Sequence, residues 1–280
     1  MLKNIIMRDN SIILAKEIRK HSLQMVHQSN SSHIGGALSI ADILAVLYTD
    51  VLSYKSSDPQ WEGRDRFILS KGHTCVALYS ALALFGFFPI EELDEYGKDG
   101  SRLLSHTSHH IPGIEISAGS LGHGLPIGCG IALAAKRKKE NFHTFVLSGD
   151  GEMDEGSMWE SILFAAHFKL DNLCLIIDYN KIQSLGNTNE VLNLEPLKQK
   201  LEAFNWNAIQ IDGHHHPSIL NALKEAKSFK GKPTVIIADT VKGKGVSFME
   251  NKLLWHYRSP NEEQYNKAIN ELENENSIYY

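Results

Sequence analysis

The chain of 280 residues has little cysteine, no excess of positive charge and no long apolar run. Its three cysteines, Cys75, Cys129 and Cys174, each lie in an apolar segment. An odd number of cysteines in such surroundings indicates reduced thiols in the core, which favours a cytoplasmic location. The formal net charge of -5 gives no reason to expect a nucleic acid or an anionic membrane as partner.

The sequence also shows no signal peptide, no membrane-spanning stretch, no internal repeat and no low-complexity linker. Charged residues interrupt the apolar positions of the N-terminal stretch 1–20, so it resembles neither a signal-peptide core nor a spanning helix. The composition, 42% hydrophobic and 22% charged, is that of an ordinary globular protein with a large core. We therefore expect one domain over residues 1–280.

Short apolar runs alternate with helical patterns along the whole chain. This alternation predicts an α/β fold of three layers, a mostly parallel sheet with helices on both faces. Ser39 is a plausible N-cap of the second helix, and the polar tail 259–280 reads as a final helix. The expected strands are 66–70, 143–148, 173–178, 208–211 and 234–239, and the expected helices are 11–28, 38–52, 74–88, 125–140, 157–168, 194–204 and 217–228.

Two polar side chains stand where neighbouring strands are expected to end. Asp150 follows one strand, between Gly149 and Gly151, and Asn180 follows the next strand along the chain. In parallel sheets, ligands bind just beyond the carboxyl ends of the strands, and the glycines let a ligand approach the backbone closely. A carboxylate, an amide and a main-chain carbonyl together suit Mg²⁺, so the pattern predicts an oxygen-ligated cation here.

Other acidic residues crowd the same turn, and like charges packed so closely repel. A Gly-Asp-Gly turn alone is common and is weak evidence for a site. The longer phrase "GDGEMDEGSMWESILFAAHFKLDNLCLIIDYNKIQS" is far more specific, because it closely resembles the thiamine-diphosphate motif of transketolases. The blocks "SSHIGGALSIADILAVLY", "RDRFILSKGHTCVALYSALALFGFF", "IPGIEISAGSLGHGLPIGCGIALAAK" and "DTVKGKGVSFMENKLLWH" resemble further parts of the same amino-terminal domain.

The resemblance implies thiamine diphosphate and Mg²⁺ as cofactors. It places Asp150 and Asn180 as side-chain ligands of the metal, with the main-chain carbonyl of Ile182 as a third. Gly151, beside Gly149, falls where a backbone N–H approaches the diphosphate.

The resemblance also assigns residues around the rest of the cofactor. His73 matches a diphosphate-binding histidine, and Leu121 falls where a side chain packs on the thiazolium face. His33, His106 and His256 match histidines that line the substrate channel and move protons, and His256 is also a candidate contact of the diphosphate.

The resemblance assigns a role to a further one of the crowded acids. Glu155 matches a buried glutamate near the subunit interface and the cofactor. Glu152 and Asp154 are expected to be solvated near a helix N-terminus.

Several histidines and three phrases stand apart from this pattern. The run His214-His215-His216 invites a zinc interpretation, but three consecutive residues rarely present their ligands to one ion, so we expect a loop. The same holds for His109 and His110. Three phrases depart from the family: "WHYRSP" introduces Tyr257 and Arg258 at the channel mouth, His123 replaces a common glutamine, and "DYN" replaces a doubled asparagine.

The resemblance covers only the first of the three domains of a full-length transketolase. The glutamate that activates the cofactor belongs to the second domain, whose blocks are absent from this sequence. We therefore expect the amino-terminal subunit of a split transketolase, active only with a carboxy-terminal subunit that carries the pyrimidine-binding domain, in an α2β2 heterotetramer.

The implied reaction is transfer of a two-carbon ketol unit from a ketose or its phosphate to an aldose. Three alternatives stay open. One is half of a related enzyme, such as a deoxyxylulose-phosphate-synthase-like, dihydroxyacetone-forming or pathway-specific sugar transketolase. The others are a non-catalytic regulatory homologue and, more distantly, a zinc-binding protein.

Overall fold

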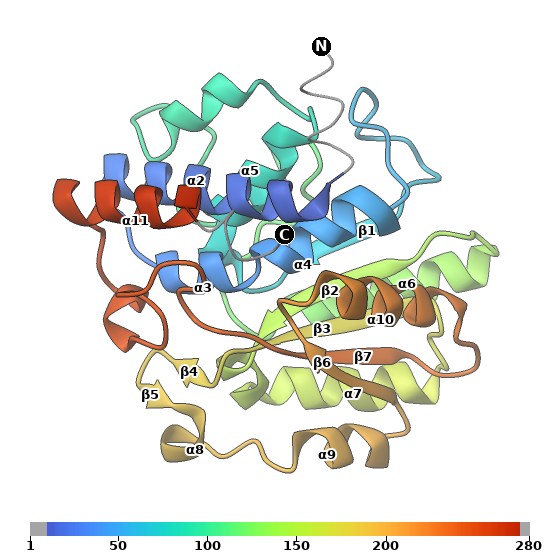
Figure 1. The fold of residues 1–280 in the computed structure, drawn as a ribbon. Helices are drawn as coiled ribbons and strands as arrows, with labels where there is room; N and C mark the ends of the chain where they lie inside the picture. Colours follow the sequence, from blue (N-terminus) through green and yellow to red (C-terminus); the bar gives the residue numbers. More distant parts are fainter. Residues whose placement is uncertain (1–9, 275–280) are drawn as a thin grey trace.

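A five-stranded parallel sheet forms the centre of the computed structural model, which describes residues 10–274 (Figure 1). The strand order is β1-β2-β3-β7-β6, and every neighbouring pair is parallel. The predicted α/β fold class is therefore confirmed. The strands are β1 (Arg66–Leu69), β2 (Thr144–Gly149), β3 (Leu173–Tyr179), β6 (Asn207–Asp212) and β7 (Thr234–Asp239).

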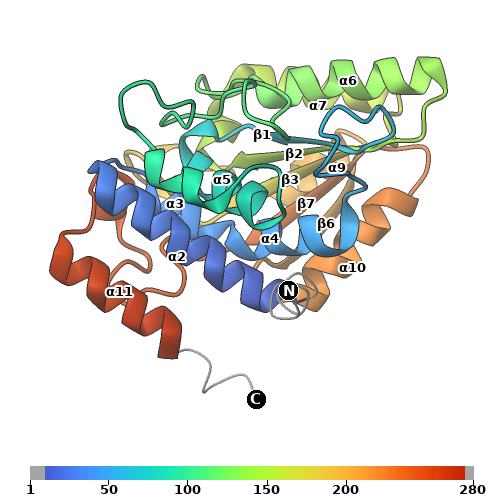
Figure 2. The ribbon, with the colours of Figure 1, turned by 90° about the horizontal axis from the view of Figure 1, so that it is seen from above.

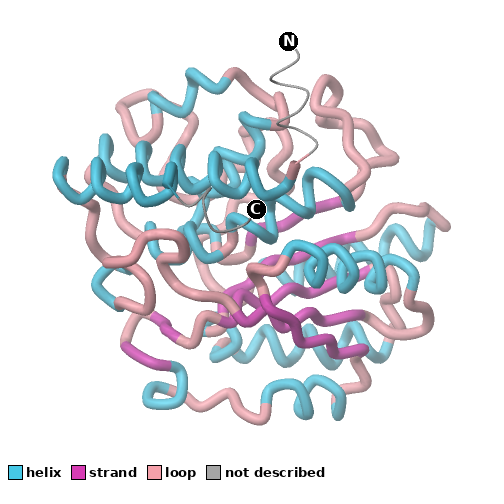
Figure 3. Tube along the Cα trace, viewed as in Figure 1, coloured by secondary structure: helices cyan, strands magenta, loops and turns pink. Residues whose placement is uncertain are grey.

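Helices cover both faces of this sheet, as the tube view shows (Figure 3). Alternate residues of each strand face opposite sides, so Phe145 and Leu147 of β2 enter one core while Val146 enters the other. One core packs against α2 (Ser11–Ser29), α3 (Ile34–Ser39), α4 (Ala41–Val46), α5 (Cys75–Leu84) and α10 (His216–Ser228). The other packs against α6 (Gly124–Lys138), α7 (Gly156–His167) and α9 (Leu197–Ala203).

Seen from above, the last helix of the described chain lies beside the first (Figure 2). This helix, α11 (Glu262–Asn274), packs on α2, where the His27 and Tyr265 rings stack at 4.6 Å. A short hairpin, β4 (Ile182–Gln183) with β5 (Gly186–Asn187), and the helix α8 (Thr188–Val191) follow β3 at the carboxyl edge of the sheet. The sequence pattern predicts neither of them, because both are too short to show a period.

The structure corrects the expected helix 38–52. The helical segment begins earlier, at Ile34, breaks at Ile40 and resumes as α4, and residues Leu47–Val51 form a π-helical turn. Ser39 is therefore the last residue of α3 and not an N-cap. Its hydroxyl donates to the carboxylate of Asp178 at 2.7 Å, so the side chain serves a tertiary contact.

The remaining boundaries differ by a few residues. The apolar segment expected as helix 74–88 ends at Leu84, and the expected helix 194–204 begins at Leu197. All three cysteines are buried and free, as predicted. Within residues 10–274, no helix is long and apolar enough to cross a membrane.

Candidate active site

The carboxyl ends of β2 and β3 bring Asp150 and Asn180 to the same edge of the sheet. Both side chains are buried, with exposed fractions of 3% and 6%. The Asp150 carboxylate accepts hydrogen bonds from the backbone N–H groups of Gly151 at 2.7 Å and Lys181 at 2.5 Å. The Asn180 amide oxygen accepts from the backbone of Ile182 at 3.2 Å. Local backbone bonds thus fix both oxygen groups beside each other.

A second carboxylate, Asp178, lies beneath this pair and is fully buried. It accepts hydrogen bonds from Ser39, from Thr240, from the Asn180 amide at 3.0 Å and from the ammonium of Lys71. Burial raises the pKa of Asp178, but the Lys71 ammonium and the donated bonds outweigh it, so the net pKa is lowered. Asp178 is ionised and orients both Lys71 and Asn180.

A second lysine faces the same region. The Lys242 ammonium donates to the carbonyl of Ile182 at 2.8 Å and lies 3.0 Å from Nδ1 of His256. Burial and the charge of Lys71 lower its pKa to about 8. The two lysines and the Asp150 carboxylate therefore face a common space, with Asp178 buried behind them.

Four histidines gather around the same space. The ring of His33 lies 5.0 Å from that of His73, 6.4 Å from that of His106 and 5.0 Å from that of His256. His33 has a positive φ of 72°, and its backbone N–H donates to the carbonyl of His256 at 3.0 Å. Segments far apart in the sequence thus meet here.

Burial and nearby cations keep three of these imidazoles neutral, those of His33, His73 and His256. Burial, then His106 and the lysines, lowers the pKa of His33 to about 4, and burial with Lys242 lowers that of His256 to about 3. The pKa of His73 is also well below its usual range, chiefly because of burial.

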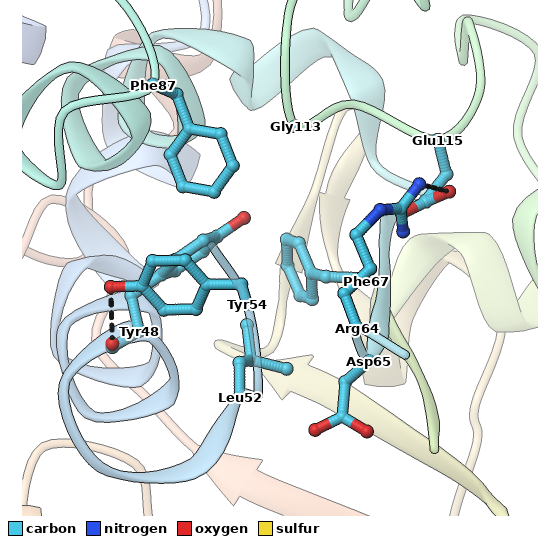
Figure 4. Close-up of a pocket in the computed structure, with 9 residues that line it drawn as sticks. All are labelled: Tyr48, Leu52, Tyr54, Arg64, Asp65, Phe67, Phe87, Gly113 and Glu115. Carbon is cyan, nitrogen blue, oxygen red and sulfur yellow. Dashed lines mark hydrogen bonds and ion pairs between the residues drawn. The ribbon is translucent and has the colours of Figure 1, made fainter. Parts of the chain in front are cut away.

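One cleft of about 420 Å³ joins all these groups. Every site residue predicted from the sequence lines it: His33, His73, His106, Leu121, Gly149, Asp150, Gly151, Glu155, Asn180, Ile182 and His256. A much smaller hollow of about 20 Å³ lies elsewhere, among Tyr48, Tyr54, Phe67 and Phe87, beside the ion pair of Arg64 and Glu115 (Figure 4). That volume has room for about one water molecule, so it cannot take a substrate.

The sequence interpretation missed the two lysines of the cleft. Lys71 stands in the quoted block "SKGH" and Lys242 in "TVKGKG", so the blocks were found but the cations were not assigned. Both side chains are only 3% exposed. Lysine is rarely buried without a partner. The burial of these two lysines is therefore the signal that could have identified them as site residues, and it is seen only in the structure.

The crowded acids also differ from expectation. Glu152 is not solvated; it is 1% exposed and burial raises its pKa. Asp154 is half-buried: one of its oxygens accepts from Gln183 at 3.0 Å and the other, also buried, has no hydrogen-bond partner among the described residues. Glu155 is exposed on the cleft rim at the start of α7.

The histidine run of the β6–α10 connection contacts a buried aspartate. His214 and His215 lie in the connection, and His216 begins α10. Nδ1 of His214 lies 2.7 Å and Nε2 of His216 lies 3.1 Å from the carboxylate of Asp42, which also pairs with Arg19. In residues 10–274, no group of three histidine, cysteine or acidic side chains has the arrangement to hold a metal ion.

The donor set of the cleft fits a hard divalent cation and a phosphate-bearing anion. The Asp150 carboxylate, the Asn180 amide and the Ile182 carbonyl are all oxygen groups, the set that Mg²⁺ prefers. Burial and the nearby Asp178 carboxylate raise the pKa of Asp150 to about 6, as expected for a carboxylate with too little positive charge around it. A Cβ on Gly151 would lie 2.8 Å from the Gln183 side chain, so only glycine keeps this backbone open to a ligand.

Comparison with known proteins identifies the family. Residues 10–273 match the family described as transketolase, thiamine diphosphate binding domain, and the chain belongs to the transketolase family. The prediction of an amino-terminal subunit of split transketolases is confirmed, because relatives of similar length carry subunit names.

Two such relatives are similar over nearly their whole length. The apulose-4-phosphate transketolase subunit of Phocaeicola vulgatus is 41% identical, with 91% of this chain and 90% of that protein covered. The 6-deoxy-6-sulfo-D-fructose transketolase subunit SqwG of a Clostridium species is 44% identical, with 93% and 95% covered.

Solved full-length transketolases share the fold. The enzyme of Campylobacter jejuni superposes with a TM-score of 0.88 at 34% identity, covering 96% of this chain and 43% of that one. The enzyme of Leishmania mexicana gives 0.88 at 32% identity, covering 94% and 41%. The chain thus spans about two fifths of the length of these single-chain transketolases.

Proposed function

We propose that this chain is the diphosphate-binding subunit of a two-chain transketolase that transfers a two-carbon ketol unit from a ketose or its phosphate to an aldose. The observation that carries the proposal is the cleft itself. An oxygen set from Asp150, Asn180 and Ile182 lines the same cleft as two buried lysines, and the cleft, at about 420 Å³, is large enough for a cofactor.

The chain's own residues divide into three groups in this proposal. Asp150, Asn180 and the Ile182 carbonyl hold Mg²⁺, which requires the Lys242 ammonium to leave that carbonyl. Lys71, Lys242 and His73, with the backbone at Gly149 and Gly151, neutralise and bind the diphosphate, because the two lysines line that part of the cleft; the Gly151 N–H would exchange its bond to Asp150 for one to the diphosphate. Leu121 packs on the thiazolium face.

Thiamine diphosphate, when bound, supplies the nucleophilic carbon that accepts the two-carbon unit and passes it on. His33, His106 and His256 line the rest of the cleft and bind the hydroxyl groups of the sugar. An imidazole ring has two nitrogens that can donate or accept hydrogen bonds, so these three side chains are suited to orient hydroxyls and to hold a proton briefly.

The partner in the proposal is a carboxy-terminal subunit with the pyrimidine-binding domain and its activating glutamate, in an α2β2 assembly in the cytoplasm. One observation supports it: the relatives of similar length are named as transketolase subunits. Glu155, exposed on the cleft rim, is proposed to meet this interface.

A pathway-specific sugar transketolase is the second candidate, and the two relatives of similar length described above favour it. Their names specify apulose 4-phosphate and 6-deoxy-6-sulfo-D-fructose. Tyr257 and Arg258, both exposed beside His256, are where this chain would differ in sugar preference. A regulatory homologue without activity is disfavoured, since it has no need of the full oxygen set.

Calorimetric titration tests the cofactor part of the proposal. Wild-type chain, mixed with the product of an adjacent transketolase-like gene, should bind thiamine diphosphate with Mg²⁺, whereas Asp150→Ala should not. Exposed Asp58→Ala is the matched control. Wild-type affinity in Asp150→Ala would remove the metal assignment.

Proton exchange tests the partner part. Exchange at the thiazolium C2 carbon, followed by NMR, should be about 10²–10⁴-fold slower with the isolated chain than with the mixed subunits, because the activating acid–base group is missing. Rapid exchange and full sugar turnover by the isolated chain would contradict a split enzyme.

A further inference from the structure

We propose that Glu152 is a positioning residue: its buried carboxylate clamps the loop 119–124 against the ends of β1 and β2, and so fixes Leu121 in the cleft. The clamp is argued from hydrogen bonds of this chain alone. Only its effect on the cofactor rests on the proposed function.

The Glu152 carboxylate binds three segments at once. Its Oε1 accepts from the backbone N–H of Gly122 at 2.8 Å and from the hydroxyl of Ser70, and its Oε2 accepts from the N–H of Gly149 at 3.3 Å. Ser70 in turn accepts from the N–H of Gly124 at 3.1 Å. One side chain therefore ties the loop, the end of β1 and the end of β2 together.

A second side chain holds the same loop by binding the carbonyl of Gly122. The hydroxyl of Ser157, in the first turn of α7, donates to the carbonyl of Gly122 at 2.7 Å. Gly122 has a φ of 81°, and a Cβ there would lie 2.8 Å from the Cβ of Glu155. Both polar groups of Gly122 are thus bound by side chains of the segment that follows Asp150, and the close fit requires glycine.

The position of this clamp gives it a consequence for the site. Leu121, next to Gly122, lines the cleft, and Asp150 lies two residues before Glu152. Glu152 also lines the cleft, but its oxygens are engaged with the backbone and Ser70. Its role is therefore to hold Leu121 at a fixed place relative to Asp150. In the proposed function, these two residues serve different ends of one bound ligand.

A glutamine cannot replace this carboxylate. The carboxylate accepts on both oxygens, whereas an amide accepts on one oxygen and donates through its nitrogen. In Glu152→Gln, the NH₂ group must face the N–H of Gly149 or that of Gly122, so a donor opposes a donor. Removing one acceptor of a charge-assisted backbone bond should weaken the loop without removing side-chain volume.

Amide hydrogen exchange of the isolated chain tests the clamp directly. In Glu152→Gln, the amides of Gly122 and Gly124 should exchange about tenfold faster than in wild type, while amides of α2 and α11 stay unchanged. Glu160→Gln, an exposed acid of α7, is the control for the change of charge. Unchanged exchange at Gly122 in a folded variant would overturn the inference.

Should Glu152→Gln fail to fold, Ser70→Ala carries the same test, since it removes the hydroxyl that links Gly124 to Glu152 and keeps the bond of Gly122 to Glu152. Exchange at Gly124 should then rise about tenfold with Gly122 nearly unaffected. Wild-type exchange at Gly124 would overturn the clamp.

Calorimetry with thiamine diphosphate and Mg²⁺, on the assembled subunits, tests the consequence. Glu152→Gln should weaken binding about tenfold in the wild-type background and much less in Leu121→Ala, because both changes remove the same contact. Additive losses would overturn the role for Leu121. A wild-type protein that does not bind the cofactor would instead contradict the proposed function and leave the exchange result standing on its own.

Discussion

Replacing Asp178 by asparagine should cost about 3 kcal/mol of unfolding free energy. The carboxylate is 0% exposed and pairs with Lys71, whose ammonium is 3% exposed. Asparagine keeps the shape, and the hydroxyl of Thr240 can rotate to donate or accept, but the Lys71 ammonium can only donate. The variant therefore leaves a buried cation without its counter-charge.

The magnitude follows from the position of that cation. Breaking a buried ion pair by removing one partner costs about 3–5 kcal/mol. Lys71 lines the cleft and its ammonium also donates to the carbonyl of Gly36 at 3.3 Å, so we expect the lower end of that range. This is a large share of the ~5–15 kcal/mol by which domains are stable.

Urea unfolding followed by circular dichroism and tryptophan fluorescence is the assay. Lys71→Met in the Asp178→Asn background should recover most of the loss, because it removes the unpaired charge. Glu95→Gln, which breaks an exposed pair with Lys98, should change stability by less than about 0.5 kcal/mol. A loss below about 1 kcal/mol for Asp178→Asn, or strict additivity with Lys71→Met, would refute the reasoning.

Three further changes test other parts of the molecule. Burial raises the pKa of Asp42, but Arg19, His214 and His216 outweigh this effect and hold the pKa well below 3.8. Wild type should therefore lose stability as the pH falls below 3.8, and Asp42→Asn should lack this loss. An identical dependence of stability on pH in the two proteins would contradict the prediction. In the assembled enzyme, His106→Ala should keep cofactor affinity but lower kcat/KM for ketoses about 10²-fold; unchanged kinetics would make it structural. Tyr257 follows His256 of the cleft, and its hydroxyl donates to the carbonyl of Ser184, which also lines the cleft, so Tyr257→Gly should raise the preference for bulkier aldoses about tenfold over wild type, with Tyr257→Phe between them. Equal preferences in all three proteins would remove Tyr257 from sugar selection.

The sheet was predictable because its strands are short apolar runs between turns. The strand ends were predictable too, since Asp150 and Asn180 follow two such runs and parallel strands end at one edge. The bounds of the expected helix 38–52 were not predictable from local sequence. Ser39 does not cap a helix there but donates to Asp178, a residue 139 positions away.

The parts of the site that the sequence could not predict depend on distant partners. Glu152 looks like one of several crowded acids until Ser70, 82 positions earlier, and the loop at Gly122 enclose it. Asp42 and His214 are 172 positions apart, and no local pattern marks their pairing. Hydrophobic periodicity predicts which face of each helix or strand is buried. It does not predict which polar groups meet in the folded chain.

The neutral histidines of the cleft make a further prediction about pH. Burial, the His106 imidazole and the lysines disfavour the charged form of His33 and lower its pKa from 6.5 to about 4. The unfolded chain therefore binds a proton to this residue at a higher pH than the folded chain does. Stability from His33 should be fully present above pH 6.5 and should decline as the pH falls from 6.5 to about 4.

NMR titration of the imidazole in the isolated chain measures the pKa directly, and His33→Gln should flatten the pH dependence of urea unfolding between pH 6.5 and 4. His109, exposed and hydrogen-bonded to Ser117, offers the matched control His109→Gln, which should leave that slope unchanged. A His33 pKa near 6.5 would mean that the cleft is more open to water than its contacts imply, and the assignment of His33 as a neutral hydrogen-bonding group would then fall.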